Sequence, residues 1–413
     1  MTARPLPATP TSAFLLPAGI PDRETVNGWT HWRQTRHAFV PAPALTLAEY
    51  RMLSPRDRQL HDLHRAATHA NLPLQDTPMS TAVARLMRSR LRTNALKHRP
   101  TTRPGLMITG GGYQGKTETA CEIAAAFEDA WLDLNQQLNP AAVPGSRDLH
   151  APVAYVQTPV TAKPKSTCQA ILDFFGADHR KMTLPQLTRA VRQSLHDHGT
   201  RVLLLDDITR LKMHRADDQD TLDLIRALMS TNTTLVLIGV NIPGSGLLRE
   251  GCQDPGTGQW AFPAPARHHH DDPATQTERR FDLVQLDPFA YDTAAHIQAW
   301  VDHLTGLEQH LRLLHATPGM LTGGVMPEYL FRRTGGVVGL LERLIEQGCT
   351  EALDTGVEAL TEALLDTVTI SLGNDHGRDP AAGEVPAVPE KPPPRRRSRN
   401  TVFDDHGPAA ATA

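Results

Sequence analysis

The sequence predicts an α/β fold, a three-layer sandwich in which helices cover both faces of a parallel five-stranded sheet, with helical segments before and after it. Short runs that are apolar throughout alternate with helix-forming segments from Gly105 onwards, a pattern typical of parallel strands buried on both faces. The first apolar run ends in glycines and is followed directly by a helix-forming segment. This order predicts a strand, a loop and a helix in succession.

Five apolar runs are expected to form the sheet, and the segments between the first four to form helices. The expected strands are GLMITG at 105–110, VAYVQT at 153–158, RVLLLDD at 201–207, TLVLIGV at 234–240 and FDLVQLDPF at 281–289. The expected helices cover 116–131, 167–175, 184–198 and 220–230.

Composition and periodicity divide the chain into five parts. Apolar residues at three- and four-residue spacing predict helices on both sides of the α/β region, whereas both termini are rich in Pro and Ala without any period. The expected parts are a disordered arm at 1–25, a helical N-terminal adaptor at 26–100, the α/β domain at 101–290, a helical domain at 291–372 and a disordered Pro- and Arg-rich tail at 373–413.

The overall composition indicates the cellular environment of the protein more than its function. The 42 Lys and Arg residues nearly balance the 45 Asp and Glu residues, so total charge neither indicates nor excludes a nucleic-acid partner. The four cysteines are far apart, with no C-x-x-C pair, which favours a reducing environment over a disulfide framework or a zinc ribbon. The N-terminal apolar run is short and broken by prolines, and we therefore expect a cytoplasmic protein without a membrane partner.

The loop after the first expected strand carries a complete phosphate-binding motif. It matches G-x-x-x-x-G-K-[ST] with Gly110, Gly111, Gly112, Tyr113, Gln114, Gly115, Lys116 and Thr117, and Glu118 follows. Glycines allow successive backbone N–H groups to point at phosphate oxygens, and the following helix adds its positive end. We expect Lys116 to reach the β and γ phosphates and Thr117 to bind Mg²⁺, so ATP and Mg²⁺ are the predicted cofactors. An ordinary Gly-rich turn is the alternative.

Two acidic residues end the third expected strand. A phosphate loop needs an acidic residue beside it to bind the metal ion, and these two can supply it. Four apolar residues place Asp206 and Asp207 at the carboxyl end of the sheet. We expect Asp206 to bind Mg²⁺ through a water and Asp207 to orient or deprotonate the attacking water. Because Asp is one methylene shorter than the Glu that is usual at this second position, slow hydrolysis is expected. The alternative is a capping Asp at a turn.

The fourth expected strand ends at Asn241. A polar side chain there would lie between the two motifs and contact the γ phosphate or the water, which is a sensor role. An asparagine that merely forms a turn is the competing interpretation.

Three further segments resemble those of the TniB/TnsC-type AAA+ ATPases, the regulators of DNA transposition within the P-loop NTPase superfamily. They are VAYVQTPVTAKPKSTCQAILDFFGA, ERRFDLVQLDPF and TGGVVGLLERLIEQGCTEALDTGVEALTEALL. The resemblance extends over roughly residues 75 to 370. It implies that the α/β domain is an AAA+ domain and that the helical domain is its lid.

The resemblance also implies a homo-oligomer with ATP between neighbouring subunits. An arginine from one subunit would complete the site of the next, and Arg279 or Arg280 matches that position, with Arg280 preferred because it directly precedes Phe281. A surface salt bridge is the alternative. The lid's usual sensor arginine has no clear match, since GGVVGLL has Val there; Arg343, or Arg332 and Arg333, are the substitutes.

Basic residues near the phosphate loop suggest contact with double-stranded DNA. The segment from Thr77 through Thr117 has no acidic residue, and Arg88 and Arg92 belong to a stripe of arginines at helical spacing. Lys163 and Lys165 resemble in place a loop that faces the duplex in the family. We expect these four residues to bind the DNA backbone, although a solvated helix face is the commoner fate of such a stripe.

Two other polar runs carry weaker predictions. The run from His268 to Asp272 is expected to be a polar loop and not a zinc site, because adjacent residues rarely share one coordination sphere. The tail segment PPPRRRSR either adds non-specific DNA affinity or keeps the end soluble.

These expectations combine into one hypothesis with two alternatives. The hypothesis is an ATPase that assembles on double-stranded DNA and recruits or activates a transposase. The alternatives are a nucleotide-switched ATPase of signalling or defence without a DNA function, and an ATPase that loads a helicase. An adjacent gene for an integrase-like transposase would favour the first.

Overall fold

The computed structural model describes residue 19 and residues 22–141, 150–160, 163–210, 219–245, 252–253, 260–261 and 277–370. The arm up to residue 18, the run from His268 to Asp272 and the tail at 373–413 lie outside the described residues, so the predictions made for them are not addressed by it.

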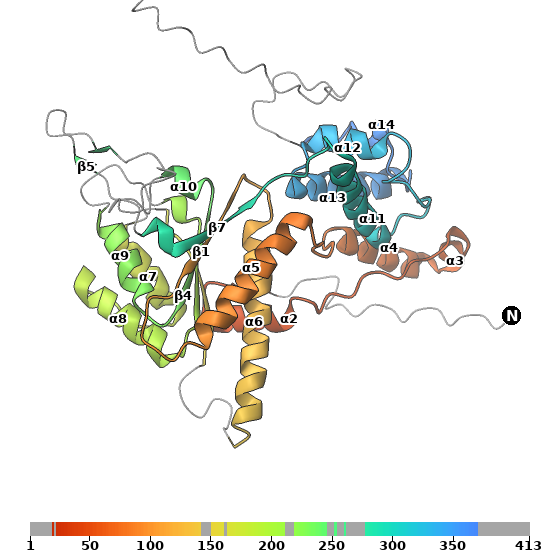
Figure 1. The fold of residues 1–413 in the computed structure, drawn as a ribbon. Helices are drawn as coiled ribbons and strands as arrows, with labels where there is room; N and C mark the ends of the chain where they lie inside the picture. The colour runs from red at the N-terminus through yellow and green to blue at the C-terminus, as the bar shows by residue number, and fades with distance from the viewer. Residues whose placement is uncertain are drawn as a thin grey trace, which may run out of the picture.

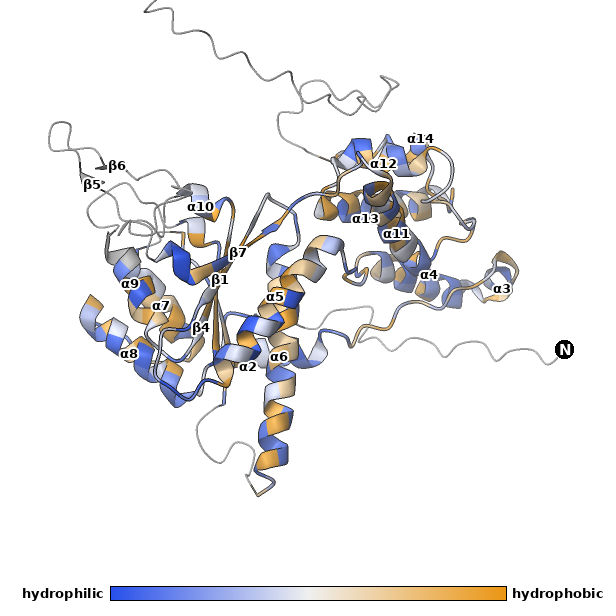
Figure 2. Ribbon diagram, in the orientation of Figure 1, coloured by the Kyte–Doolittle hydropathy of each residue, from blue (hydrophilic) through white to orange (hydrophobic). Residues whose placement is uncertain are grey.

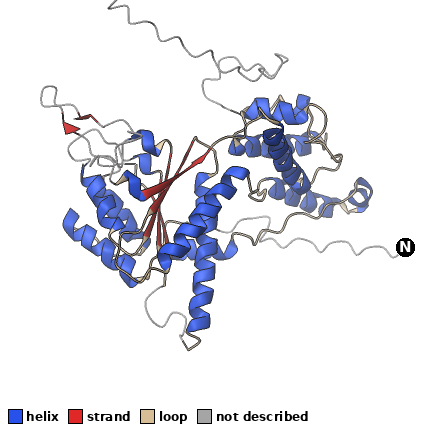
Figure 3. Cartoon of the chain, in the orientation of Figure 1, coloured by secondary structure: helices blue, strands red, loops and turns tan. Residues whose placement is uncertain are grey.

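The centre of the molecule is a parallel sheet of five strands, as predicted (Figure 3). The strands are β1 (Gly105–Gly110), β2 (Val153–Gln157), β3 (Val202–Asp206), β4 (Thr234–Gly239) and β7 (Phe281–Leu286). Their order across the sheet is β2-β3-β4-β1-β7. Gln157 pairs with Asp206 and Gly110 with Leu286, so the carboxyl ends of the strands share one edge of the sheet.

Helices cover both faces of this sheet (Figure 1). One face carries α2 (Val26–Thr35), α5 (Pro78–Ala95) and α6 (Lys116–Leu138), and the other carries α7 (Pro164–Phe174), α8 (Leu184–Asp197) and α9 (Gln219–Met229). Apolar residues predominate in β1 and β4 (Figure 2), and β3 and β4 are buried at every position, which is the pattern of strands covered on both faces. The predicted three-layer α/β sandwich is therefore confirmed.

A second hydrophobic core lies in the C-terminal helical domain. Its helices are α11 (Ala294–His310), α12 (Met326–Thr334), α13 (Val338–Thr355) and α14 (Glu362–Leu365). Trp300 is fully buried there, and its indole N–H donates to the carbonyl of Pro327 over 2.8 Å. Gly335 and Gly356 end α12 and α13 in the left-handed conformation that favours glycine.

The helices expected to form an N-terminal adaptor are divided between the two cores. Trp29 of α2 and Met87 of α5 are buried with the sheet. In contrast, α4 (Pro55–His69) packs on α13, and its buried Arg65 donates to both carboxylate oxygens of Glu358 at 2.7 and 3.0 Å. The short α3 (Leu47–Met52) precedes α4. The region thus connects the α/β domain with the helical domain.

Short elements complete the described part of the chain. They are the 3-10 turns η1 (Ile208–Arg210) and η4 (Glu278–Arg280), helix α10 (Ile242–Ser245), and the antiparallel pair β5 (Cys252–Gln253) and β6 (Trp260–Ala261). Among the described helices, none combines the length and the apolar character that crossing a bilayer requires.

Candidate nucleotide site

The loop between β1 and α6 has a backbone that only a glycine-rich sequence adopts easily. Gly115 has a φ of 72° and caps the N-terminus of α6. At Gly110 the φ is 158°, and a Cβ would lie 2.3 Å from the carbonyl oxygen of Leu286 on the adjacent strand. A side chain at either position would strain or displace the loop. The two outer glycines of the motif are therefore required by the local structure.

The motif lysine curls back over this loop. The ammonium group of Lys116 donates to the carbonyl oxygen of Gly111. Burial lowers the pKa of Lys116, and the carboxylates of Asp206 and Asp207 act in the opposite direction. The lysine therefore lies within electrostatic range of both predicted acidic residues, inside a loop whose N–H groups and helix end favour an anion.

The metal-binding residues predicted from the sequence are in contact with each other. The hydroxyl of Thr117 donates to Oδ2 of Asp206 over 2.8 Å, which joins the start of α6 to the end of β3. Asp206 is only 4% exposed, and its Oδ1 accepts from the backbone N–H of Asp207 over 2.8 Å. A hydroxyl and a carboxylate side by side are the oxygen donors that Mg²⁺ prefers, so the donor set fits this ion.

A third donor to Asp206 comes from a residue that the sequence analysis missed. Tyr155, in the middle of β2, donates its hydroxyl to Oδ2 of Asp206 over 2.9 Å. The run VAYVQT predicts an apolar strand and no functional side chain. The one signal available was the hydroxyl within that run, two residues before the position that pairs with Asp206.

The second acidic residue has a different environment from the first. Asp207 adopts a φ of 50° and forms an ion pair with Arg210 of η1, with 2.7 Å between Nη2 and Oδ2. The side-chain amide of Gln157 donates to the same oxygen over 3.2 Å. The carboxylate is therefore at the predicted edge of the sheet and is held by a cation and an amide, neither of which the sequence analysis identified.

The predicted sensor residue lies at the expected end of β4. Asn241 is exposed, with a φ of 48°, and its side-chain amide lies over Gly244 in the first turn of α10. This is also the conformation of a turn asparagine. The sensor role stays a prediction.

Glu118, the residue after the motif, connects the site to the N-terminal segment. Arg23 donates to both of its carboxylate oxygens, at 3.1 and 2.8 Å. The Arg23 guanidinium also lies over the rings of Trp32 and Tyr155, 5.1 and 5.4 Å from their centroids. Residue 23 falls within the range expected to be a disordered arm, where composition alone could not indicate a partner so distant in sequence.

The helical domain touches the phosphate loop through backbone. The N–H of Gly339, in the first turn of α13, donates to the carbonyl of Tyr113 over 2.9 Å. Of the proposed substitutes for a sensor arginine, Arg332 bonds Glu328 and Arg333 bonds Asp366, both within the helical domain. Arg343 is half-buried on α13.

Arg280 lies at the amino ends of the strands, whereas the phosphate loop lies at their carboxyl ends. It precedes Phe281, which pairs with Gly105, whereas the loop begins after Gly110. At about 3.3 Å per residue, the length of β1 places Arg280 about 17 Å from the edge that carries the site. Arg279 and Arg280 are both exposed there.

The predicted DNA contacts are exposed but are not brought together. Arg88 and Arg92 are exposed on α5, and Lys163 and Lys165 are exposed at the start of α7, on the opposite face of the sheet. Two other arginines of the basic segment have structural partners: Arg90 bonds Asp282, and Arg103 is 2% exposed and donates to the backbone carbonyl of Lys97.

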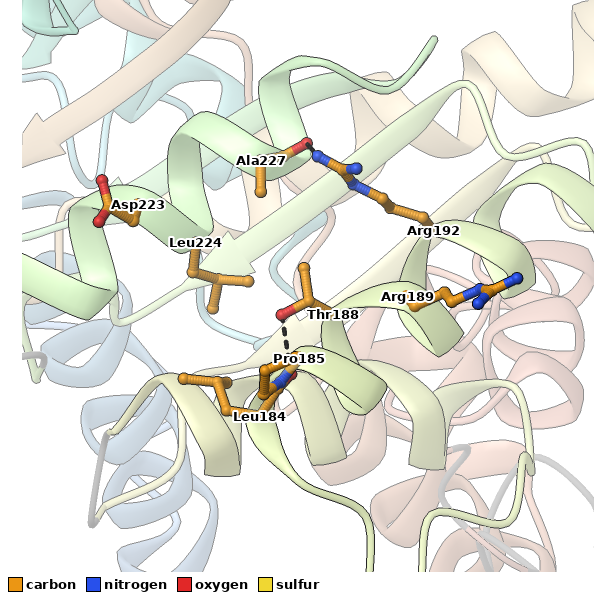
Figure 4. A pocket seen from close by; sticks show the side chains of 8 residues that line it. All are labelled: Leu184, Pro185, Thr188, Arg189, Arg192, Asp223, Leu224 and Ala227. Carbon is orange, nitrogen blue, oxygen red and sulfur yellow. Dashed lines mark hydrogen bonds between the residues drawn. The ribbon is translucent and has the colours of Figure 1, made fainter.

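A cavity of about 620 Å³ lies elsewhere, between α8 and α9 (Figure 4). Arg192 crosses it to donate to the carbonyl of Ala227, and Thr188 donates to the carbonyl of Leu184. Its lining includes Arg189 and Asp223 and none of the predicted nucleotide-site residues. It therefore contributes nothing to the phosphate loop.

Comparison with known proteins agrees with this geometry. Residues 98–242, which include the loop and both acidic residues, match the family model of the AAA domain. The α/β domain has the AAA+ fold. No curated protein matches the chain.

One solved structure supports the AAA+ fold, and others are similar over much of the chain at lower TM-scores. The ORC1 protein of Aeropyrum pernix, solved in complex with DNA, is 12% identical with a TM-score of 0.51, over 73% of this chain and 67% of that one. Cdc6p of Pyrobaculum aerophilum is 11% identical over 71% and 67% of the two chains, with a TM-score of 0.42. AMPPCP-bound DnaA of Aquifex aeolicus is 13% identical over 68% and 63% of the two chains, with a TM-score of 0.38. At these identities the likeness concerns the fold alone.

Proposed function

We propose that the chain is an ATP-dependent regulator of DNA transposition that forms homo-oligomers on double-stranded DNA and recruits or activates a transposase. The observation that carries the proposal is the hydrogen bond between Thr117 and Asp206, because it joins the phosphate loop to an acidic strand end in an AAA+ fold. The further parts of the proposal depend on this nucleotide site.

ATP is the proposed ligand of residues 110–118. The backbone of the loop and Lys116 bind its phosphates, and Thr117 and Asp206 hold Mg²⁺, which neutralises phosphate charge when bound. Asp207 orients or deprotonates the attacking water. Its shorter side chain and its ion pair with Arg210 both favour slow hydrolysis.

The position of Arg280 supports a role between subunits. An arginine about 17 Å from its own phosphate loop reaches a nucleotide only in a neighbouring subunit. A head-to-tail contact of this kind produces rings or helical filaments. Arg280 then stabilises charge on the γ phosphate of that neighbour and reports ATP across the interface.

DNA binding is supported by exposed Lys and Arg side chains. Those on α5 belong to a segment that has no acidic residue. Arg88 and Arg92 on α5 and Lys163 and Lys165 at α7 contact the DNA backbone in this proposal, which makes binding sensitive to salt. The ORC1 protein with the same fold was solved with DNA. The transposase partner rests on the three segments that resemble the TniB/TnsC type, which form β2 with α7, β7, and α13.

Electron microscopy of the chain with duplex DNA tests the assembly. With a non-hydrolysable ATP analogue, the wild-type chain forms rings or filaments on DNA, and Lys116→Ala abolishes them. Nucleotide binding with no DNA-bound assembly would instead favour a signalling ATPase. The transposase part is tested by looking for an integrase-like transposase gene beside this one and by co-sedimentation of the chain with its product, with and without the analogue.

A further inference from the structure

Tyr155 links the candidate metal-binding aspartate to the N-terminal segment Asp22–Arg36. Its hydroxyl donates to Oδ2 of Asp206, the same oxygen that accepts from Thr117. Tyr155 is 5% exposed, so this hydroxyl and the carboxylate that accepts from it lie together in the core.

The ring of Tyr155 is held from the N-terminal segment. The Trp29 ring stacks on it, with 6.3 Å between centroids and 13° between planes. The Arg23 guanidinium lies 5.4 Å from its centroid and is itself fixed by two hydrogen bonds to Glu118. A cation over an aromatic face contributes on the order of 1 kcal/mol when it is partly desolvated.

The N-terminal segment is firmly attached at this place. Trp29 donates its indole N–H to the buried carboxylate of Glu128 over 2.8 Å. Arg33 pairs with Glu128 and Arg36 with Glu122, so the segment lies along one acidic side of α6.

We propose that Tyr155 is a positioning residue for Asp206, and that Trp29 and Arg23 of the N-terminal segment hold Tyr155 in place. This inference rests on the proposed nucleotide site. Asp206 must present one carboxylate orientation toward the metal-bound nucleotide, and its three donors fix that orientation. The segment before the α/β domain thereby becomes part of the nucleotide site without contacting the nucleotide.

Magnesium dependence of nucleotide binding tests the proposal on the full chain. A fluorescent ATP analogue is titrated first in EDTA and then with rising Mg²⁺, and the Mg²⁺ midpoint is measured. Loss of a partner of a metal ligand weakens metal affinity by roughly 10- to 100-fold. Tyr155→Phe is therefore expected to raise the Mg²⁺ midpoint about tenfold, with nucleotide affinity in EDTA and the thermal unfolding midpoint unchanged. Arg23→Gln, which keeps the hydroxyl and frees the ring, raises the midpoint less.

A matched control is Tyr329→Phe. Tyr329 also donates its hydroxyl to an aspartate, Asp366, over 2.7 Å, but within the helical domain. The Tyr329→Phe variant is therefore expected to leave the Mg²⁺ midpoint at the wild-type value. An unchanged midpoint in Tyr155→Phe, or an equal loss of nucleotide affinity in EDTA, overturns the positioning role. A wild-type chain that shows no magnesium dependence overturns the proposed nucleotide site itself.

Discussion

Arg210 and Asp207 form an ion pair across one turn of 3-10 helix, with 2.7 Å between nitrogen and oxygen. Arg210 also donates to the carbonyl of Thr158 over 3.1 Å, which ties it to the end of β2. The carboxylate proposed to prepare the attacking water is thus paired with a cation. We expect this pairing to compete with the role proposed for Asp207, because the carboxylate oxygen that bonds Arg210 is not free to contact a water.

Removal of the cation is expected to raise basal ATP hydrolysis. Both side chains are more than a third exposed, so the pair contributes no more than about 1 kcal/mol, equivalent to about fivefold in rate. Arg210→Ala should therefore increase single-turnover hydrolysis up to about fivefold. Arg226→Ala, which breaks another i,i+3 pair on α9, is the control. A slower Arg210→Ala enzyme would show that the arginine assists the reaction.

Arg280→Ala is expected to abolish hydrolysis while each subunit still binds ATP. The arginine is too far from its own phosphate loop to act there. Mixing Arg280→Ala with Asp207→Asn subunits should restore activity, because about a quarter of random head-to-tail interfaces combine an intact Asp207 with an intact Arg280. Arg279→Ala, at the exposed neighbouring position, should retain activity. A mixture as inactive as its components would rule out Arg280 acting between subunits.

DNA affinity should depend on the exposed arginines of α5. Each phosphate contact contributes about 0.9 to the slope of log affinity against log salt. Arg88→Ala with Arg92→Ala should weaken binding to duplexes of any sequence and reduce this slope by about 2. The comparison is Arg189→Ala with Arg192→Ala, two exposed arginines of α8 on the opposite face. Equal losses in both double variants would indicate a general charge effect.

Acid is expected to destabilise the helical domain. Burial lowers the pKa of His303 to about 4, and neither ring nitrogen has a hydrogen-bond partner among the described residues. The unfolded histidine titrates near 6.5, so the unfolded chain binds more protons between those values. The free energy of unfolding is therefore unaffected above about pH 6.5 and falls as the pH drops toward 4, by on the order of 3 kcal/mol.

Urea unfolding at pH 7 and pH 5 measures this effect. His303→Phe keeps a ring beside Phe289 and Trp300 and should lose part of the difference between the two pH values. Substitution of the exposed His98 should not change it. His61 and His69, whose pKa values burial also lowers to about 4, contribute in the same direction. Equal acid sensitivity in His303→Phe would contradict the assignment.

The sequence predicted the sheet and the phosphate loop well for a physical reason. Strands such as VLLLD are buried on both faces and are apolar throughout, so periodicity alone identifies them. The loop motif is local, and its glycines are required by its own backbone. The contact between Thr117 and Asp206 followed because carboxyl ends of parallel strands meet at one edge.

Contacts between distant segments left no such signal. Arg23 and Glu118 are 95 residues apart, and Arg65 and Glu358 are 293 apart. An amphipathic pattern shows that α4 and α5 bury one side but does not show against which core, because burial is non-directional. The division of the N-terminal helices between two cores, and the role of Tyr155, therefore required the structure.

The central claim is that residues 110–118 and Asp206 together bind ATP with Mg²⁺. Equilibrium binding of labelled ATP to the full chain tests it most directly. We expect the wild-type chain to retain ATP more tightly with Mg²⁺ than in EDTA, Asp206→Asn to lose that difference, and Lys116→Ala to lose most affinity in both conditions. Equal retention of ATP by the wild-type chain and Lys116→Ala, or none by either, would contradict the account.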